Sequence, residues 1–537
     1  TAAVSTAAIG AAAAFTRERR ADGPVVDPPA IRSGVATGDV THESAIVWSR
    51  CDRPAHMLVE YAAADEPRRL SRAGPVRATA DSDFTARVEL TGLPPGRVIH
   101  YRVWFRDEGG RLSPPAAGRF RTAPPPGKPA DVFFAWSGDT AGQGFGINPE
   151  WGGYRCYDAI RRLEPHFFIH SGDHIYADNP VPERLPLADG TVWTNVVTPA
   201  KSRPAVTLDD FRGNYQYNLL DEHVRRFNAE VAQVVQWDDH ETTNNWYPDQ
   251  VLAGRADAAA YRGVADGRAL AARARQAFFE YLPIRPQAAD HERIYRSFAY
   301  GTSAELFVLD ARSYRGPNSP NTQAKPGSDT AFLGADQKAW LKAGLRASKA
   351  TWKVVCSDMP IGLVVADKMD GRPHFEAVAN GDPGTPLGRE LEFADLFADL
   401  HSDRVKNVVW LTADVHYAAA HHYSPDRAGF RGKFDPFWEF VAGPLHAGTF
   451  GPNKLDGTFG PEVRFQWAPR PGLQLPTGRR LPADFKLPLA PSDGMQSFGT
   501  VRVDGRTQVL TVEFRNMFGE LIRDGDRAGW FELEPVR

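Results

Sequence analysis

The strongest constraint on the fold is a pattern that occurs four times: a short apolar run ends, and an acid follows within about three residues. The runs cover residues 132–136, 166–170, 231–237 and 408–411, and the acids are Asp139, Asp173, the pair Asp238 and Asp239, and Asp414. Short apolar runs that alternate with longer helical patterns are typical of buried strands in α/β domains. Because sites in open α/β sheets gather at the carboxyl ends of strands, we expect these acids to meet at one edge of the sheet.

Carboxylates that meet at one edge repel one another, and burying them is costly unless a cation compensates. For any single acid, such as Asp139, a helix cap or a turn is the ordinary alternative. Four such segments together favour a pair of metal ions, and the presence of imidazole adds iron, zinc and manganese to the candidates. No serine or cysteine nucleophile motif and no Walker loop is evident. The sequence therefore predicts hydrolysis of phosphate esters by metal-bound hydroxide.

The chain divides into regions of different pattern, and its 537 residues are enough for two or three domains. Residues 29–124 contain short strands separated by turns, which predicts a β-sandwich similar to a fibronectin type III module. The proline-rich residues 125–130 are predicted to be a linker, and residues 131–537 the catalytic domain. Within that domain, residues 450–492 are predicted to be a long loop, and residues 500–514 are expected to complete the sheet.

Composition narrows the partners and the compartment. The formal net charge of −3 gives no general basic field, so no stable nucleic-acid partner is expected. No apolar run is long enough to span a membrane, and three cysteines are too few for a disulfide scaffold. Residues 1–28 begin with an alanine-rich stretch followed by a basic one, which we interpret as the remnant of an export leader, with a disordered tail as the alternative. The oligomeric state cannot be predicted from these features.

Four longer motifs resemble those of one family. They are G-D-H-I-Y at 172–176, W-D-D-H-E at 237–241, L-D-A-R-S-Y-R at 309–315 and A-D-V-H at 413–416. In this order they resemble the alkaline phosphatase D (PhoD) family of calcineurin-like metallophosphoesterases, which is related to the purple acid phosphatases. The resemblance covers about residues 30–535. It implies an α/β fold, the four-layer αββα metallophosphoesterase sandwich, preceded by the all-β domain.

The resemblance also implies cofactors and a location. Family members carry Fe³⁺ and Ca²⁺, with Zn²⁺ or Mn²⁺ as alternatives at the second position. They hydrolyse phosphomonoesters and phosphodiesters, and they are typically exported through the twin-arginine route. We therefore expect a periplasmic or secreted enzyme that scavenges phosphate from small phosphate esters. Phospholipase D activity, which would need an exposed apolar rim near the site, is the alternative. A non-catalytic binding protein is a third, against which the clustered acids argue.

By resemblance, six residues would hold the metals: Asp139, Asp173, Tyr176, Asp239, Asp414 and His416. Asp173 would bridge the ions. Tyr176 would bind iron as a phenolate, which only a strongly Lewis-acidic ion keeps ionised, and the alternative is a packed aromatic. Family prototypes carry an iron-binding cysteine after the first strand. Here Gly138 follows Ser137, and the run G-D-T-A-G-Q resembles the purple acid phosphatase pattern, so Asp139 is expected to replace that cysteine.

Three residues are the catalytic candidates: His240, Asp239 and Arg312. His240 would contact the phosphate or act as the general acid, with a structural histidine as the alternative. Arg312 would neutralise the phosphate through a bidentate contact, and a structural salt bridge is an equal alternative. The predicted substrate contacts are Asn244, Asn245 and His446.

Overall fold

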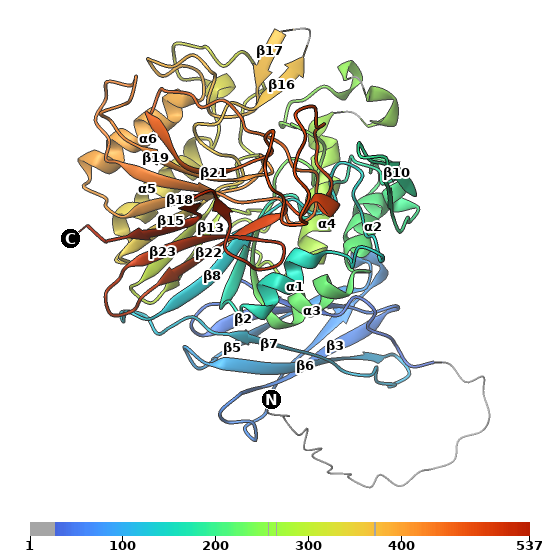
Figure 1. The fold of residues 1–537 in the computed structure, drawn as a ribbon. Helices are drawn as coiled ribbons and strands as arrows, with labels where there is room; N and C mark the ends of the chain where they lie inside the picture. The colour runs from blue at the N-terminus through green and yellow to red at the C-terminus, as the bar shows by residue number, and fades with distance from the viewer. Residues whose placement is uncertain (1–26, 256, 262, 265, 370–371, 537) are drawn as a thin grey trace, which may run out of the picture.

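The computed structural model describes residues 27–255, 257–261, 263–264, 266–369 and 372–536. The predicted leader remnant therefore lies almost wholly outside the described residues. Two large sheets form the centre of the molecule (Figure 1). The nine-stranded sheet has the order β26 (Trp530–Leu533), β23 (Leu510–Asn516), β22 (Ser497–Val503), β8 (Val132–Ser137), β9 (Phe167–Ser171), β12 (Ala232–Gln236), β1 (Val35–Gly38), β2 (Ser44–Arg50) and β5 (Thr85–Thr91).

The second sheet has seven strands, and helices cover the outer faces of both sheets (Figure 1). Its order is β13 (Arg296–Tyr300), β14 (Ala304–Val308), β15 (Trp352–Cys356), β18 (Val408–Thr412), β20 (Phe437–Val441), β19 (Ala418–Tyr423) and β21 (Pro461–Trp467). The nine-stranded sheet is covered by α1 (Arg155–Arg162), α2 (Leu208–Asn218), α3 (Glu222–Glu230) and α4 (Gly267–Tyr281), and the other sheet by α5 (Ala335–Ala347) and α6 (Glu390–Ser402). The predicted four-layer αββα fold is confirmed.

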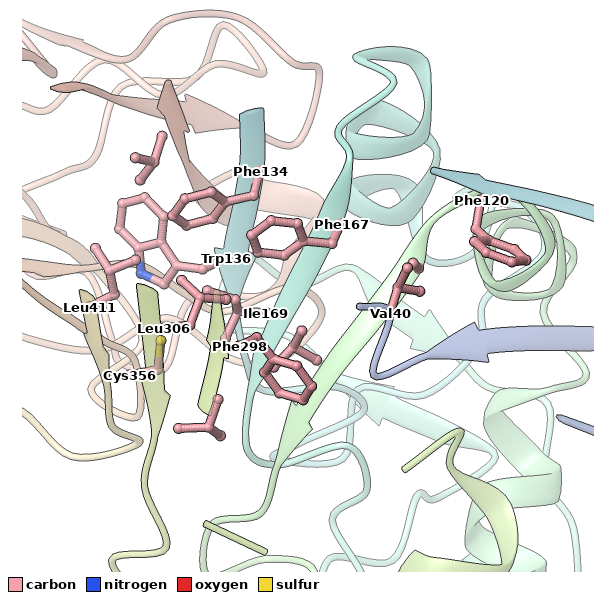
Figure 2. Packing of buried hydrophobic residues seen from close by; sticks show 14 of the residues in the cluster. Val40, Phe120, Phe134, Trp136, Phe167, Ile169, Phe298, Leu306, Cys356 and Leu411 are labelled. Atoms are coloured by element: carbon pink, nitrogen blue, oxygen red, sulfur yellow. The ribbon is translucent and has the colours of Figure 1, made fainter. Parts of the chain in front are cut away.

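The core between the two sheets follows from the period of two along each strand. In β8, Phe134 and Trp136 point between the sheets, whereas Ala135 packs among the helices on the other face. Figure 2 shows Trp136 beside Leu411 of β18 and near Leu306 of β14. The indole Nε1 of Trp136 also donates to the carbonyl of Thr412 at 3.1 Å, so it ties the end of β18 to β8 across the core.

The four strands that carry the acids do not share one sheet. β8, β9 and β12 are parallel neighbours in the nine-stranded sheet, as expected. β18 instead lies in the seven-stranded sheet, where it runs parallel to β15 and β20. The prediction of a single sheet edge is therefore wrong for β18, because its carboxyl end reaches the site by the packing of one sheet on the other.

The N-terminal region is a seven-stranded β-sandwich that is continuous with the catalytic sheet. One of its layers contains β4 (Ser71–Ala78), β3 (Ala55–Ala63), β6 (Val98–Asp107) and β7 (Ala116–Arg121). The other layer is β1, β2 and β5, and β1 pairs in parallel with β12. Residues 125–130 connect the two regions while packed against the protein, since the amide of Thr302 donates to the carbonyl of Lys128 at 2.9 Å. The sandwich thus protects one edge of β12, the strand that leads to W-D-D-H-E.

A buried ion pair fixes this junction. Asp39, directly after β1, accepts from Nη2 of Arg296 at 2.6 Å and from its Nε at 2.9 Å, and the amide of Arg285 donates to it at 2.7 Å. The side chains of Asp39 and Arg296 are 0% and 3% exposed. Because Arg296 belongs to β13, the pair joins the sandwich layer to the seven-stranded sheet.

Other sequence predictions can be compared with the described residues. Residues 500–514 do lie in the sheet, as parts of β22 and β23, but the prediction that they finish it is wrong because β26 pairs with β23 and forms the edge. The prediction of one long loop over residues 450–492 is wrong at β21, which pairs with β19. The three cysteines are buried and unpaired. Among the described helices, none combines the length and the apolar character that crossing a membrane requires.

We expect Asp39→Asn to lower the free energy of unfolding by about 3–5 kcal/mol, because it leaves the buried Arg296 guanidinium without its counter-charge. Urea denaturation followed by tryptophan fluorescence measures the change. Glu60→Gln, which disrupts a pair whose Arg72 side chain is 82% exposed, is the matched control and should change little. Equal midpoints for Asp39→Asn and Glu60→Gln would contradict this account of the junction.

Candidate metal centre

The backbone turns sharply where the strands end. Asp139, Asp173, Asp414 and His416 all have positive φ angles, of 70°, 52°, 67° and 60°. Residues other than glycine adopt this left-handed region rarely, and each such position costs about 1–3 kcal/mol unless its surroundings compensate. The strained positions coincide with four of the predicted metal ligands.

These turns bring donor atoms together in three overlapping groups: Asp139 with Asp173 and His416, Asp173 with Asp239 and His240, and Asp238 with Asp239 and Asp414. Within each group the donor atoms lie within 4.8 Å of one another. Asp173 belongs to the first two groups, and Asp239 to the last two. The structure thus gathers five of the six predicted metal ligands into one continuous set of donors.

Tyr176, the sixth predicted ligand, lies beside the first group. Its hydroxyl is 2.7 Å from Nε2 of His416, and Nε2 is 3.5 Å from Oδ1 of Asp139. Nδ1 of His416 donates to the carbonyl of Gly448, which leaves the lone pair on Nε2 directed at these oxygens. The ring of Tyr176 packs so closely on Gly142 that a Cβ there would lie 2.6 Å from Cζ of the ring. The first group and Tyr176 together therefore offer two carboxylates, an imidazole and a phenol.

The carboxylates are buried without enough partners to balance their charge. Burial raises the pKa of Asp139 and of Asp173 well above the usual carboxyl value, and Asp239 adds to both shifts. Burial and then Glu376 do the same for the pKa of Asp414. Oδ2 of Asp139 and Oδ1 of Asp239 accept no hydrogen bond among the described residues. Such oxygens fit a site whose remaining partner is a cation.

Glu241, the last residue of W-D-D-H-E, holds two of these loops together. Oε1 accepts from the amide of His174 at 2.6 Å, and Oε2 accepts from the amides of Asp173 and Asp238 at 3.2 and 2.8 Å. Burial raises the pKa of Glu241 to about 7, although these amide donors oppose the shift. Its carboxylate thus joins the loop after β9 to the loop after β12.

His240 faces the site with one nitrogen and is oriented through the other. Nδ1 lies 2.6 Å from Oδ1 of Asp178, and Nε2 lies 3.9 Å from Oδ2 of Asp239. Burial by itself lowers the pKa of His240, but Asp178, Asp239 and Asp173 outweigh it and raise that pKa well above the usual value. The ring also stacks on Tyr176, with 4.1 Å between the centroids. Asp178 therefore fixes both the position and the tautomer of His240.

An open cavity of about 570 Å³ gives access to these groups. The predicted residues that line it are Asp173, Asp239, His240, Asn244, Asn245, Asp414 and His416. Gln143, Glu376 and Asn453 add further polar groups, whereas Val365, Val415, Phe450, Pro452 and Leu487 form an apolar part. The backbone amide of Asn244 donates to Oδ2 of Asp178 at 2.8 Å, and the backbone amide of Asn245 donates to Oδ2 of Asp239 at 2.5 Å. Both asparagines line the cavity, and their contact with substrate stays a prediction.

Comparison with known proteins now identifies the family. A model described as PhoD-like phosphatase matches residues 134–514, and one described as PhoD-like phosphatase, N-terminal domain, matches residues 17–124. The chain belongs to the PhoD-like phosphatases. The family predicted from the motifs is confirmed, and the protein is a phosphoric ester hydrolase.

Relatives of this PhoD-like phosphatase agree with the assignment. Alkaline phosphatase D of Bacillus subtilis (strain 168) is 28% identical over 450 residues, which are 79% of this chain and 71% of that protein. A solved structure of PhoD superimposes with a TM-score of 0.66 at 22% identity, covering 96% of this chain and 94% of the other. The purple acid phosphatase PPD1 from yellow lupin (Lupinus luteus) seeds gives 0.56 at 14% identity, covering 94% and 74%. At these identities, the two structures support the fold.

Two of the predicted catalytic and substrate-binding residues of the PhoD-like phosphatase do not line the cavity. Arg312 is fully buried, and its guanidinium contacts Asp238, Asp358 and Glu376, with nitrogen–oxygen distances of 2.5, 3.2 and 2.9 Å. The predicted bidentate phosphate contact is therefore wrong for this conformation, because carboxylates already occupy the guanidinium.

His446 is the second of these residues. Its side chain is 1% exposed, lies against Tyr154 and is 3.1 Å from the carbonyl of Gly146, so the predicted substrate contact is wrong. Only its backbone supports the site, since its amide donates to the carbonyl of Asp139 at 2.9 Å.

Sequence reasoning missed Asp178, Glu376 and the orienting role of Glu241. Asp178 stands two residues after Tyr176, close enough to G-D-H-I-Y to be suspected, but the pairing with His240 depends on the fold. Glu376 lies outside all four motifs, and no local pattern marks it.

We expect Glu241→Gln to weaken metal binding by about 10–100-fold while the fold is retained, because an amide offers one acceptor oxygen to three backbone donors. Titration of metal-depleted protein, followed by elemental analysis, measures the affinity. Glu392→Gln is the control, since Glu392 also accepts two backbone amides, those of Phe332 and Leu333, away from this centre. Equal metal affinity in the parent and both variants would contradict the role given to Glu241.

Proposed function

We propose that this enzyme hydrolyses small phosphomonoesters and phosphodiesters at a multinuclear centre that holds Fe³⁺ and Ca²⁺. The observation that carries the proposal is the set of overlapping donor groups, which is buried, rich in carboxylates and open to one cavity. Lewis-acid neutralisation of the phosphate oxygens and activation of the attacking water are the chemistry that such cations supply when bound.

The donor types support one choice of metal at each position. Asp139, Asp173, His416 and the phenol of Tyr176 suit Fe³⁺, because a phenol surrounded by carboxylates ionises only beside a strongly Lewis-acidic ion. Burial, Asp173 and Asp139 all raise the pKa of Tyr176, so the protein alone favours the neutral phenol. The group formed by Asp238, Asp239 and Asp414 offers only oxygen, which suits Ca²⁺, with Zn²⁺ or Mn²⁺ as alternatives.

We assign the proton transfer to His240. Its side chain lines the cavity next to Asp239, and Asp178 holds Nδ1 so that Nε2 is presented toward the substrate. In this role His240 donates a proton to the leaving alkoxide as the ester bond breaks. Asp178 acts as a positioning residue.

The two walls of the cavity fit the two parts of an ester. Asn244 and Asn245 lie on the polar side, where amide groups can donate to phosphate oxygens. Phe450 and Leu487 lie on the apolar side, and Leu487 is 44% exposed. We propose that the organic group of the ester packs there. Phosphate scavenging outside the cytoplasm remains a prediction from the sequence.

Metal removal tests the centre directly. Chelation should abolish hydrolysis of an aryl phosphate and of a bis-aryl phosphate, and Fe³⁺ together with Ca²⁺ should restore it.

Substitution of the predicted ligands tests the same centre. Loss of a residue that only hydrogen-bonds to a metal ligand lowers activity by about 10–100-fold. We expect Asp173→Asn to lower activity by more than this, because Asp173 itself belongs to two donor groups. Tyr176→Phe should lose the visible tyrosinate–iron absorption. Full activity in Asp173→Asn, or in chelated enzyme, would refute the assignment.

The role of His240 predicts a dependence on the leaving group. His240→Asn should slow hydrolysis of an alkyl phosphate by about 10²–10⁴-fold, and that of a 4-nitrophenyl phosphate far less, because nitrophenolate leaves without a proton. Asp178→Asn should also slow both reactions, but each by a smaller factor than His240→Asn does. Comparison of kcat for the two substrates measures the difference. An equal loss for both substrates in His240→Asn would rule out the general-acid role.

A further inference from the structure

Two adjoining hollows lie at the opposite end of the seven-stranded sheet from the metal centre. Both are lined by residues at the starts of its parallel strands, such as Lys353 of β15 and Asn407 just before β18, whereas Asp414 follows the end of β18. The hollows share Val405, Lys406, Asn407 and Val536. Among the described residues, none lines both one of these hollows and the catalytic cavity.

The first hollow, which we call the apolar groove, has a volume of about 240 Å³. Aromatic side chains line it, among them Phe397 of α6, Trp410 of β18 and Phe437 of β20. The rings of Phe397 and Phe437 are 4.8 Å apart between centroids. Val408 is half-buried and Val536 is 61% exposed. An apolar hollow of this kind gains free energy when a hydrocarbon group displaces water from it.

The second hollow, which we call the basic basin, has a volume of about 490 Å³ and carries five cationic side chains and a single carboxylate among its described lining residues. The carboxylate, Asp403, pairs with Arg346, and Lys406 pairs with Asp435 at 2.7 Å. Lys353, Arg404 and Arg506 have no carboxylate oxygen within 4.0 Å in the described part of the chain, although Glu305 acts on Lys353, and Asp504 on Arg506, from further away. This excess of positive charge is local, since the whole chain has a net charge of −3.

We propose that the groove and the basin together form an accessory site for an amphiphilic anion with one alkyl chain and an acidic head group. The chain would occupy the apolar groove, and a phosphate-like head would lie among Lys353, Arg404 and Arg506. The shared residues Val405 and Lys406 place the two environments side by side, as the head and the first methylenes of one molecule require. A small anion would leave the groove empty, and a neutral amphiphile would not balance the excess of positive charge that lines the basin.

Isothermal titration of the full-length protein with decylphosphonate tests the proposal. This probe carries both parts of the ligand, and its carbon–phosphorus bond is no ester, so the catalytic centre cannot consume it. Methylphosphonate supplies the head alone, and decyl maltoside supplies the chain with a neutral head. We expect decylphosphonate to bind at least tenfold more tightly than either. Equal affinity for decylphosphonate and either partial probe would overturn the proposal.

Charge and shape variants locate the binding. Arg404→Glu/Arg506→Glu and, separately, Val405→Gln should each weaken decylphosphonate binding by tenfold or more while hydrolysis of an aryl phosphate is unchanged. Arg68→Glu/Lys325→Glu makes the same charge change at exposed positions elsewhere and should bind like the parent. Asp173→Asn should also retain binding, which separates this site from the metal centre. Parental affinity in Arg404→Glu/Arg506→Glu, or loss of binding in Asp173→Asn, would overturn the proposal.

The source of the amphiphile can be distinguished with vesicles. If the parent sediments with vesicles that contain lysophosphatidylglycerol, an anionic lipid with a single acyl chain, and Arg404→Glu/Arg506→Glu does not, the ligand is a membrane lipid. Decylphosphonate binding without sedimentation would identify a soluble amphiphile, and both results retain the site.

Discussion

Repulsion between buried carboxylates is the interaction on which the rest of this structure depends. Asp139, Asp173 and Asp414 lie in one site beside an open cavity, and each is held on a left-handed backbone. Arg312 offsets part of the charge on one side, but it is shared by several acids. The remaining charge has to be balanced by cations, because unbalanced carboxylates would otherwise protonate or move apart. The fold must therefore hold these loops close while their charges oppose it.

The contacts around the site are those expected of a scaffold that resists this repulsion. Glu241 joins the loops after β9 and β12, and Trp136 joins β8 to the end of β18 in the other sheet. The β-sandwich extends the same sheet beyond β12, and Asp39 fastens it to Arg296 of the second sheet. The sandwich therefore supports β12, the strand that leads to three of the residues in the donor groups.

Local patterns predicted the strands, because each buried strand is an apolar run and each acid follows its own strand. They also predicted the family, and five of the six metal ligands that they predicted lie in the donor groups, because the motifs that carry them lie within single loops. They did not predict that β18 lies in a different sheet, since an apolar run carries no information about its partner strands. For the same reason the sequence cannot distinguish an arginine that faces substrate from one enclosed by acids, as Arg312 is. Such facts depend on contacts between segments far apart in the chain.

The replacement of a cysteine by Asp139 stays a prediction from the sequence, and the space around this turn supports it. Family prototypes, by the resemblance of the sequence, carry a thiolate at this turn, and here Gly138 stands between Ser137 and Asp139. A Cβ on Gly138 would lie 3.1 Å from the carbonyl of Gly172, so little room remains for a side chain. The carboxylate of Asp139 instead extends toward Gly443, where a Cβ would lie 2.5 Å from its Oδ2. If the proposed iron is bound there, a hard oxygen donor in place of sulfur would stabilise Fe³⁺ relative to Fe²⁺ and so favour a Lewis-acid role in one oxidation state.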